Sequence, residues 1–331
     1  MTTLLELKEK IVRFYGKNEV FITPVIRFLI AFAVFMSINS SIGYMKSITR
    51  TPVALILALL CSVFPANCMI FLASAVILAQ MYALSLEVCA VTLVLFVLVY
   101  LLYFRFVPKN GYGVLLTPLC FQLHVPYMMP MGLGLVREVY SVFAMICGTV
   151  VYFFLNGVRE NAPVLSGTGG EEDAAVSKIV VILNQLIGNK EMYLVLGVMA
   201  ATLVVVYVIR RMSIEYAWTV AIVSGILFQS VGLIAGYLLL GITGKTYEVL
   251  IGNGVACLAA FFLQFVFFNL DYSRTERLQF EDDEYYYYVK AVPKAFVPGT
   301  DKKVKRFGRD EERLSKKQFA REMDIDEDWL E

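Results

Sequence analysis

Residues 191–211 read EMYLVLGVMAATLVVVYVIRR, and this stretch decides the class of the fold. No charged residue lies between Glu191 and Arg210, so the segment is apolar over the length of a membrane span. A helix needs about 20 such residues to cross the hydrocarbon core of a bilayer. The stretch therefore predicts a transmembrane helix, and the two arginines at its end favour a cytoplasmic position for that end.

Nine further apolar runs accompany this one along the chain. Six are long enough to cross a bilayer: 21–44, 66–83, 85–104, 139–156, 215–240 and 247–269. The runs at 52–64, 113–124 and 126–136 are too short to cross as straight helices, so they must be re-entrant, tilted in a thinned region or shielded by neighbouring helices. We therefore expect an all-α, polytopic helical membrane protein with about 8–10 apolar spans, some of them short or broken by proline.

The composition agrees with this class. The 331 residues are 59% hydrophobic, with a mean hydropathy of +0.68. A soluble domain of this length cannot hide so much apolar surface from water. The charges are segregated, because residues 271–331 hold 29 of the 57 Lys, Arg, Asp and Glu residues. We therefore expect an amphipathic N-terminal helix at 1–20, a transmembrane domain at 21–270 and a charged tail at 271–331.

The segments outside the spans carry weaker patterns. Residues Leu4, Leu7, Ile11 and Phe14 have helical spacing, which is typical of a helix on the membrane surface or of a simple cytosolic lead-in. In the long loop 157–190, apolar residues recur at helical spacing from Val176 to Ile187, after an irregular stretch.

In the tail, the strand-prone segments Arg277–Phe280 and Tyr285–Val292 predict a short hairpin, so the tail is mixed rather than all-α. Ser315 and Gln318 fit a capping box, and a short final helix is expected there.

Lysine and arginine placement predicts the orientation. With the N-terminus inside and all ten runs crossing, eleven basic residues fall on the inner face and six in the outer loops. Because positive residues favour the cytoplasmic side, we expect a multi-pass protein of the cell membrane with both termini cytoplasmic and with loop 157–190 outside. The first apolar run contains Arg27 and lacks a small-residue cleavage site, so no cleaved signal peptide is expected.

The pattern of a soluble enzyme is absent. His124 is the single histidine, and the six cysteines all lie in apolar segments, so we expect free thiols and neither a metal site nor a cofactor. Gly244-Lys245-Thr246 resembles the end of a phosphate-binding loop, but Leu239 occupies the position of the required glycine. We expect no catalytic residues, no enzymatic activity and no nucleic-acid partner; the expected surroundings are the lipid bilayer.

Four prolines interrupt the apolar runs: Pro65, Pro118, Pro126 and Pro130. A broken helix frees backbone groups that need protein, water or a ligand, and many transporters bind their substrate at such breaks. Residues 52–104 and 113–156 each begin with a short run and a proline and end with a long span. If all ten runs cross, these two three-span units face opposite ways, as an inverted repeat requires. The alternative is that the prolines only shape the helix bundle.

Polar side chains inside apolar runs are the candidate binding residues. Asn67, His124 and Gln229 are expected to bind substrate and, in a transporter, to line one water-accessible cavity. The alternative for each is a hydrogen bond between helices, as for Gln80 and Gln264.

At the junction of the last span and the tail the sequence reads DYSRTE at 271–276 and FEDDEYYYYVKAVPK at 280–294. This resembles a group of uncharacterised multi-pass membrane proteins of Gram-positive anaerobes, some loosely labelled permease. The similarity extends over most of the chain, including Leu55–Pro65 and the residues Arg210-Arg211-Met212-Ser213. The resemblance implies a membrane protein, and it brings no activity or binding residue with it.

Two functions therefore remain open. The first is a transporter or permease-like component with its site at the proline-broken helices. The second is a non-transporting membrane scaffold or signalling component, whose cytosolic tail recruits a cytosolic or membrane protein partner. Tyr285–Tyr288, beside the acidic Glu281–Glu284, would be the docking element of that tail.

Overall fold

The computed structural model describes residues 2–108, 111–166, 172–212, 214–242, 244–267, 276–281 and 286–291. Within these residues the chain forms thirteen helices and one two-stranded sheet. It divides into two compact units, Met1–Glu9 with Phe296–Glu331, and Lys10–Ala295. The second unit holds the helical body described below.

Each of the ten apolar runs forms one helix, and seven of these are long and apolar enough to cross a bilayer. They are the seven runs whose length alone sufficed for a crossing, fewer than the 8–10 spans expected when the short runs are included, and the fold is that of a multi-pass membrane protein. These helices are α2 (Glu19–Ile42), α4 (Ala66–Leu84), α5 (Leu86–Phe106), α8 (Ser141–Glu160), α11 (Lys190–Arg211), α12 (Ala217–Leu239) and α13 (Thr246–Phe267).

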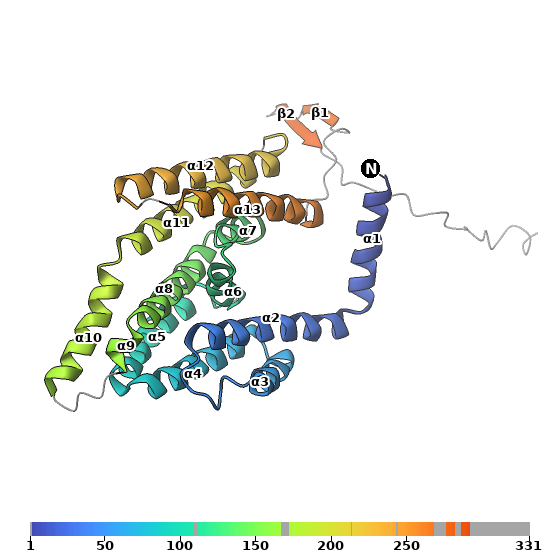
Figure 1. Cartoon of the computed structure of the whole chain (residues 1–331). Helices are drawn as coiled ribbons and strands as arrows, with labels where there is room; N and C mark the ends of the chain where they lie inside the picture. Colours follow the sequence, from blue (N-terminus) through green and yellow to red (C-terminus); the bar gives the residue numbers. More distant parts are fainter. Residues whose placement is uncertain are drawn as a thin grey trace, which may run out of the picture. The chain divides into compact units, whose positions relative to one another are not determined.

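The other three runs form short helices: α3 (Thr51–Val63), α6 (Gly111–Gln122) and α7 (Met128–Val136). At about 1.5 Å per residue, none of them reaches the ~30 Å thickness of the hydrocarbon core. Figure 1 shows α6 and α7 between α8 on one side and α11–α13 on the other, and α7 packs mainly on α11 and α13. Neighbouring helices therefore cover part of α6 and α7, but the C-terminal end of α6 leads into the exposed residues Leu123 and His124.

The surface of the long helices is apolar where no other helix covers it. Along α12, Val220, Val223, Leu227 and Val231 recur at intervals of three and four residues, and all four are exposed. Residues at this spacing form one face of a helix. Because a large exposed apolar stripe is unfavourable in water, this face fits contact with lipid.

Buried side chains form a large cluster among α2–α6 and α8, and a smaller one among α7 and α11–α13. An intermediate cluster joins α6 and α8 to α11–α13 through Phe121, Met145 and Leu203. The connection between α6 and α7 is therefore the place where the chain passes from one group of helices to the other.

The units 52–104 and 113–156 do not repeat each other's packing. In the first unit α3 packs mainly on the preceding helix α2, whereas in the second α6 packs mainly on α8 of its own unit. The common order of short and long runs thus reflects the positions of the prolines, and the helix contacts carry no sign of an inverted repeat.

The remaining elements follow the weaker sequence patterns. Helix α1 (Thr2–Lys17) exposes Ile11 and Phe14, and α9 (Ala162–Leu165) follows α8 directly. The predicted loop helix is α10 (Glu172–Ile187), which packs against α5 and α8.

The predicted hairpin is also present. Strands β1 (Glu276–Glu281) and β2 (Tyr286–Ala291) pair antiparallel, with Phe280 opposite Tyr287. The expected helix near Ser315 and Gln318 lies outside the described residues.

Candidate functional site

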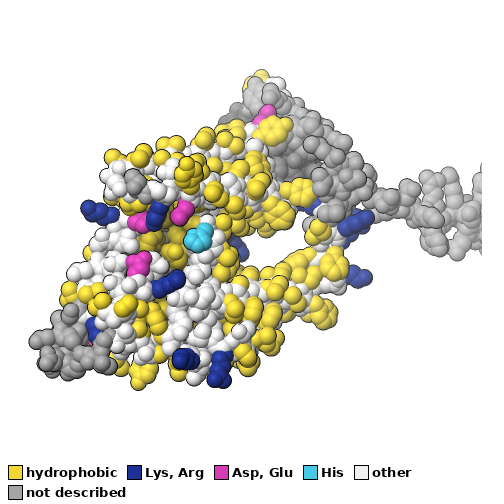
Figure 2. All heavy atoms as spheres, viewed as in Figure 1, with side chains coloured by type: hydrophobic (Ala, Val, Ile, Leu, Met, Phe, Trp, Pro, Cys, Tyr) yellow, Lys and Arg dark blue, Asp and Glu magenta, His cyan; other side chains and the backbone are white. Residues whose placement is uncertain are grey.

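Six helix ends enclose a cavity of about 600 Å³ at one end of the helical body. They are the C-terminal ends of α6, α8, α10 and α12 and the N-terminal ends of α11 and α13. Figure 2 shows acidic and basic side chains and the histidine gathered around a hollow on this face, and hydrophobic side chains flank it. The cavity therefore lies where the polar ends of the spans meet.

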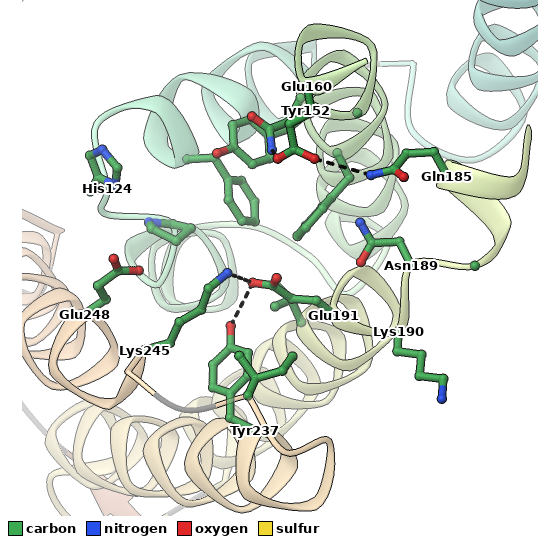
Figure 3. A pocket seen from close by; sticks show the side chains of 18 of the residues that line it. His124, Tyr152, Glu160, Gln185, Asn189, Lys190, Glu191, Tyr237, Lys245 and Glu248 are labelled. Atoms are coloured by element: carbon green, nitrogen blue, oxygen red, sulfur yellow. Dashed lines mark hydrogen bonds and ion pairs between the residues drawn. The ribbon is translucent and has the colours of Figure 1, made fainter. Parts of the chain in front are cut away.

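The break between α6 and α7 forms one side of the mouth. Helix α6 ends because His124 adopts a left-handed conformation, with φ 58°, and the amide of Val125 donates to the carbonyl of Cys120 at 2.9 Å. This pattern closes a helix at its C-terminus, where glycine is the usual residue. Pro126 follows and cannot continue the helix. As a result, His124 lies exposed at the mouth (Figure 3). Tyr127 also lines the cavity and is buried.

Two of the four predicted helix-breaking prolines do not break a helix. Pro126 separates α6 from α7, and Pro65 precedes the first residue of α4, as expected. Pro118 and Pro130 instead lie inside α6 and α7. Pro130 is the third residue of its helix, where the backbone amide has no intrahelical acceptor, so the ring costs little there.

Pro118 is accommodated by a close helix contact. It removes the amide that would bond to the Val114 carbonyl, and Gly148 of α8 packs against this place. A Cβ atom on Gly148 would lie 2.8 Å from the Val114 oxygen and 2.7 Å from the Cβ of Thr117. The absence of a side chain at Gly148 is therefore what allows α8 to cover this part of α6.

The floor of the cavity is aromatic and apolar. The rings of Phe121 and Tyr152 stack with centroids 4.6 Å apart, and Phe153 meets both of them edge-on. Tyr127 and Tyr237 are buried, and the Tyr237 hydroxyl donates a hydrogen bond to Glu191. Large rings with polar tips thus close the bottom of the cavity and still offer hydroxyl groups to it.

Two carboxylates on the wall are held by different partners. Glu191, in the first turn of α11, forms an ion pair with Lys245 and accepts a hydrogen bond from the Tyr237 hydroxyl at 3.4 Å. Glu160, the last residue of α8, accepts hydrogen bonds from Asn156 Nδ2 at 2.8 Å and from Gln185 Nε2 at 3.3 Å. Figure 3 shows both carboxylates turned toward the cavity.

Backbone capping explains why α11 begins at the cavity. The side chain of Asn189 precedes the helix and accepts a hydrogen bond from the amide of Met192 at 3.0 Å. Asparagine is among the best residues for this position, and an acid in the first turn interacts favourably with the helix dipole. The local sequence Asn189-Lys190-Glu191 therefore both starts the helix and places Glu191 on the wall.

The structure does not bring the three predicted binding residues together. His124 lines the cavity, and Gln229 lies buried beneath its floor, where Nε2 is 3.5 Å from the Tyr127 carbonyl. Asn67 is in the first turn of α4, and its Oδ1 accepts a hydrogen bond from the Tyr103 hydroxyl at 2.8 Å. The three residues do not line one cavity, and a role for Asn67 and Gln229 in substrate binding stays a prediction.

Other polar residues of the spans join helices to each other or to loops. Gln80 accepts a hydrogen bond from the amide of Met45 at 2.7 Å, and Gln264 donates to Thr219 at 2.9 Å. Arg27 donates to the carbonyl of Phe64 at 3.4 Å, just after the end of α3. For Gln80 and Gln264, the contacts are those of the structural alternative, a hydrogen bond to another part of the bundle.

Most residues of the cavity were missed by the sequence reasoning. Glu160, Gln185, Glu191 and Lys245 lie at span ends and in connections, where charged and amide residues are ordinary. The sequence contains one signal for this group: if all ten runs cross, the four residues lie on the same side of the membrane as His124. A shared side of the membrane does not by itself show that the residues are in contact.

The cavity offers aromatic surface, amide groups and charged groups of both signs, which suits a small polar ligand with an apolar part. A scan against protein-family models, a search of curated proteins and a search of solved structures each gave no match to this chain.

Proposed function

We propose that the chain is a permease-like transport protein that takes up a small polar solute through the cavity at the α6–α7 break. The observation that carries the proposal is the position of Tyr127. It is the last residue of the break, lines the cavity and is buried in its floor. A movement of the short helices α6 and α7 would therefore open the floor without breaking any long span. The volume of about 600 Å³ is in the range of small-molecule sites.

Unpartnered polar atoms continue from the floor into the helical body. Gln229 Oε1, Asn253 Oδ1 and Gln264 Oε1 are buried and have no hydrogen-bond partner among the described residues. Buried polar atoms normally have partners, so water or a passing solute is the natural partner here. Asn253 and Gln264 are about 16 Å apart along α13 at its rise per residue. We take these atoms as polar groups along a path that a solute could follow beside α7, α12 and α13.

The other end of this path is closed by Arg210. Its guanidinium donates to the carbonyl of Leu135 near the end of α7, and it lies 5.5 Å and 5.8 Å from the ring centroids of Tyr207 and Trp218. In the orientation predicted from the basic residues, the cavity opens to the outside and Arg210 lies at the cytoplasmic end. The arrangement then corresponds to an outward-open state of a transporter that opens alternately to the two sides.

Uptake by the purified full-length protein in proteoliposomes tests the proposal. Radiolabelled amino acids, sugars, organic cations and carboxylates are offered as separate classes, with protein-free liposomes as the reference. We expect one class to enter faster with the protein and Gln229→Leu to reduce that entry. Gln122→Leu is the matched control, because Gln122 is on α6 but does not line the cavity. Entry no faster than in protein-free liposomes for all four classes would contradict transport.

The hairpin of β1 and β2 supports a second candidate function, that of a non-transporting membrane scaffold whose tail recruits a protein partner. Tyr286 and Tyr287 are 62% and 46% exposed, and successive strand residues face opposite sides, so both sides of β2 present a ring. We propose that this hairpin docks a protein partner. Deletion of residues 271–331 should abolish recovery of that partner in a crosslinking pull-down, and uptake should survive. Recovery of all partners by the truncated chain would contradict docking by the tail.

A further inference from the structure

The charges that line the cavity are predominantly negative. Glu160, Glu191 and Glu248 line it from three helices, and Lys245 is the one lysine that turns into it. Lys190 also contributes to the lining, but it is exposed and Figure 3 shows its side chain pointing away. Three carboxylates and one ammonium group leave two negative charges when His124 is neutral.

The two charges in excess belong to Glu160 and Glu248. Glu191 is paired with Lys245, so its charge is compensated. The donors to Glu160 are the amides of Asn156 and Gln185, which orient the carboxylate without neutralising it. The neighbouring residue Arg159 does not line this cavity; its side chain lines a separate, smaller one. The negative charge at Glu160 is therefore available to a ligand.

The two carboxylates are on different walls. Glu160 ends α8, whereas Glu248 is in the first turn of α13, on the side of His124. Figure 3 shows them on different sides of the cavity, with the Glu191–Lys245 pair on the wall between them. Between these walls the aromatic rings of Phe121, Tyr152 and Tyr237 provide apolar surface, and the faces of such rings attract cations.

We infer that the cavity binds a short aliphatic diamine, with one ammonium group at Glu160 and the other at Glu248. The apolar chain between the ammonium groups would lie on the aromatic floor. A dianion of equal length would be repelled by the excess negative charge, and a neutral diol would leave both carboxylates uncompensated. The diamine site rests on the proposed function in that both use the same cavity, but binding itself requires no transport.

Equilibrium binding to the full-length protein in detergent tests the inference. The probes are putrescine, succinate and butanediol, which share a four-carbon chain and carry positive, negative and no charge. We expect saturable binding of putrescine and no binding of the other two. Replacing a carboxylate that contacts an ammonium group should weaken binding by about tenfold or more. That loss is expected for Glu160→Gln and for Glu248→Gln.

Glu87→Gln is the matched control. Glu87 is at the start of α5, accepts a hydrogen bond from the Ser85 hydroxyl and does not line the cavity. Its substitution should leave putrescine binding unchanged. The inference is overturned if putrescine does not bind, if succinate or butanediol binds in its place, or if the Glu160→Gln and Glu248→Gln variants bind it as the natural chain does.

The same experiment separates the inference from the proposed function. Putrescine binding, with none of the four solute classes entering proteoliposomes faster than protein-free liposomes, would leave the diamine site standing and contradict transport. Uptake of another class of solute without putrescine binding would leave transport standing and overturn the diamine site.

Discussion

The Nε2 atom of Gln229 lies 3.5 Å from the carbonyl oxygen of Tyr127. Gln229 is fully buried in α12, and Tyr127 is the last residue of the break between α6 and α7, so this contact joins a long span to the floor of the cavity. The other polar atom of the amide, Oε1, has no hydrogen-bond partner among the described residues. The side chain thus supports the floor with one atom and offers the other to a solute or to water.

This relationship predicts different effects of Gln229→Leu on stability and on uptake. Leucine has a similar volume and removes the unpartnered acceptor Oε1, which favours the folded state, but it also removes the Nε2 donor to the Tyr127 carbonyl, which opposes it, so the thermal stability should change little. Uptake should fall, because the polar path loses its first group below the floor. Thermal unfolding in detergent and uptake in proteoliposomes measure the two effects. A lower unfolding temperature together with unchanged uptake would assign Gln229 a structural role only.

Gly252 controls how closely α13 approaches the floor. A Cβ atom there would lie 2.4 Å from Cδ2 of the Tyr127 ring, so Gly252→Ala must displace that ring. Forced overpacking in a core costs about 1–3 kcal/mol. We expect a lower unfolding temperature and weaker binding of any ligand of the cavity. Gly254→Ala is the control on the same helix, because nothing lies within 4 Å of its Cβ position. Equal effects of the two substitutions would contradict the contact.

Gly148 tests the shielding of the proline-containing helix α6. Gly148→Ala should push α8 away from Thr117 and from the carbonyl of Val114, at a cost of about 1–3 kcal/mol. Gly197→Ala in α11 should cost less, because its Cβ position has no neighbour within 4 Å. Thermal unfolding of both variants in one detergent makes the comparison. If Gly148→Ala is no less stable than Gly197→Ala, α8 does not seal this part of α6.

The positions of the helices could be predicted from the sequence, but the contacts between them could not. Each apolar run became a helix because the length of a hydrophobic segment is a local property. Pro126 was recognisable as a break because it follows an apolar run that is too short to span. The turn at His124 was not, because a non-glycine residue in the left-handed conformation has no sequence signature of its own.

The candidate site shows the limit of that reasoning. Asn67 and Gln229 are polar groups in apolar runs, and such a group must find a partner, but this rule does not say whether the partner is another helix or a ligand. The Tyr103 hydroxyl and the Tyr127 carbonyl provide those partners. Glu191 and Lys245 pair across 54 positions of sequence, and only the packing of α11 against α12 and the connection to α13 brings them together.

The predicted orientation has a direct chemical test. A cysteine at Asn184, which is exposed at the cavity, should react with a membrane-impermeant maleimide added to intact cells. A cysteine at Gln279, which is exposed in β1, should react only after the membrane is permeabilised. The natural chain, whose six cysteines are buried or half-buried, gives the background. Labelling of Gln279→Cys from outside would reverse the orientation and place the cavity on the cytoplasmic side.

The most direct test of the account is counterflow in proteoliposomes that contain the full-length protein. Vesicles loaded with unlabelled putrescine are diluted into a trace of radiolabelled putrescine. The account predicts a transient accumulation of label, because the cavity at the α6–α7 break exchanges solute across the membrane. It predicts that Glu160→Gln and Gln229→Leu remove the accumulation and that Glu87→Gln keeps it. Label that enters no faster than into protein-free vesicles, although the protein binds putrescine in detergent, would contradict the claim that this cavity belongs to a transporter.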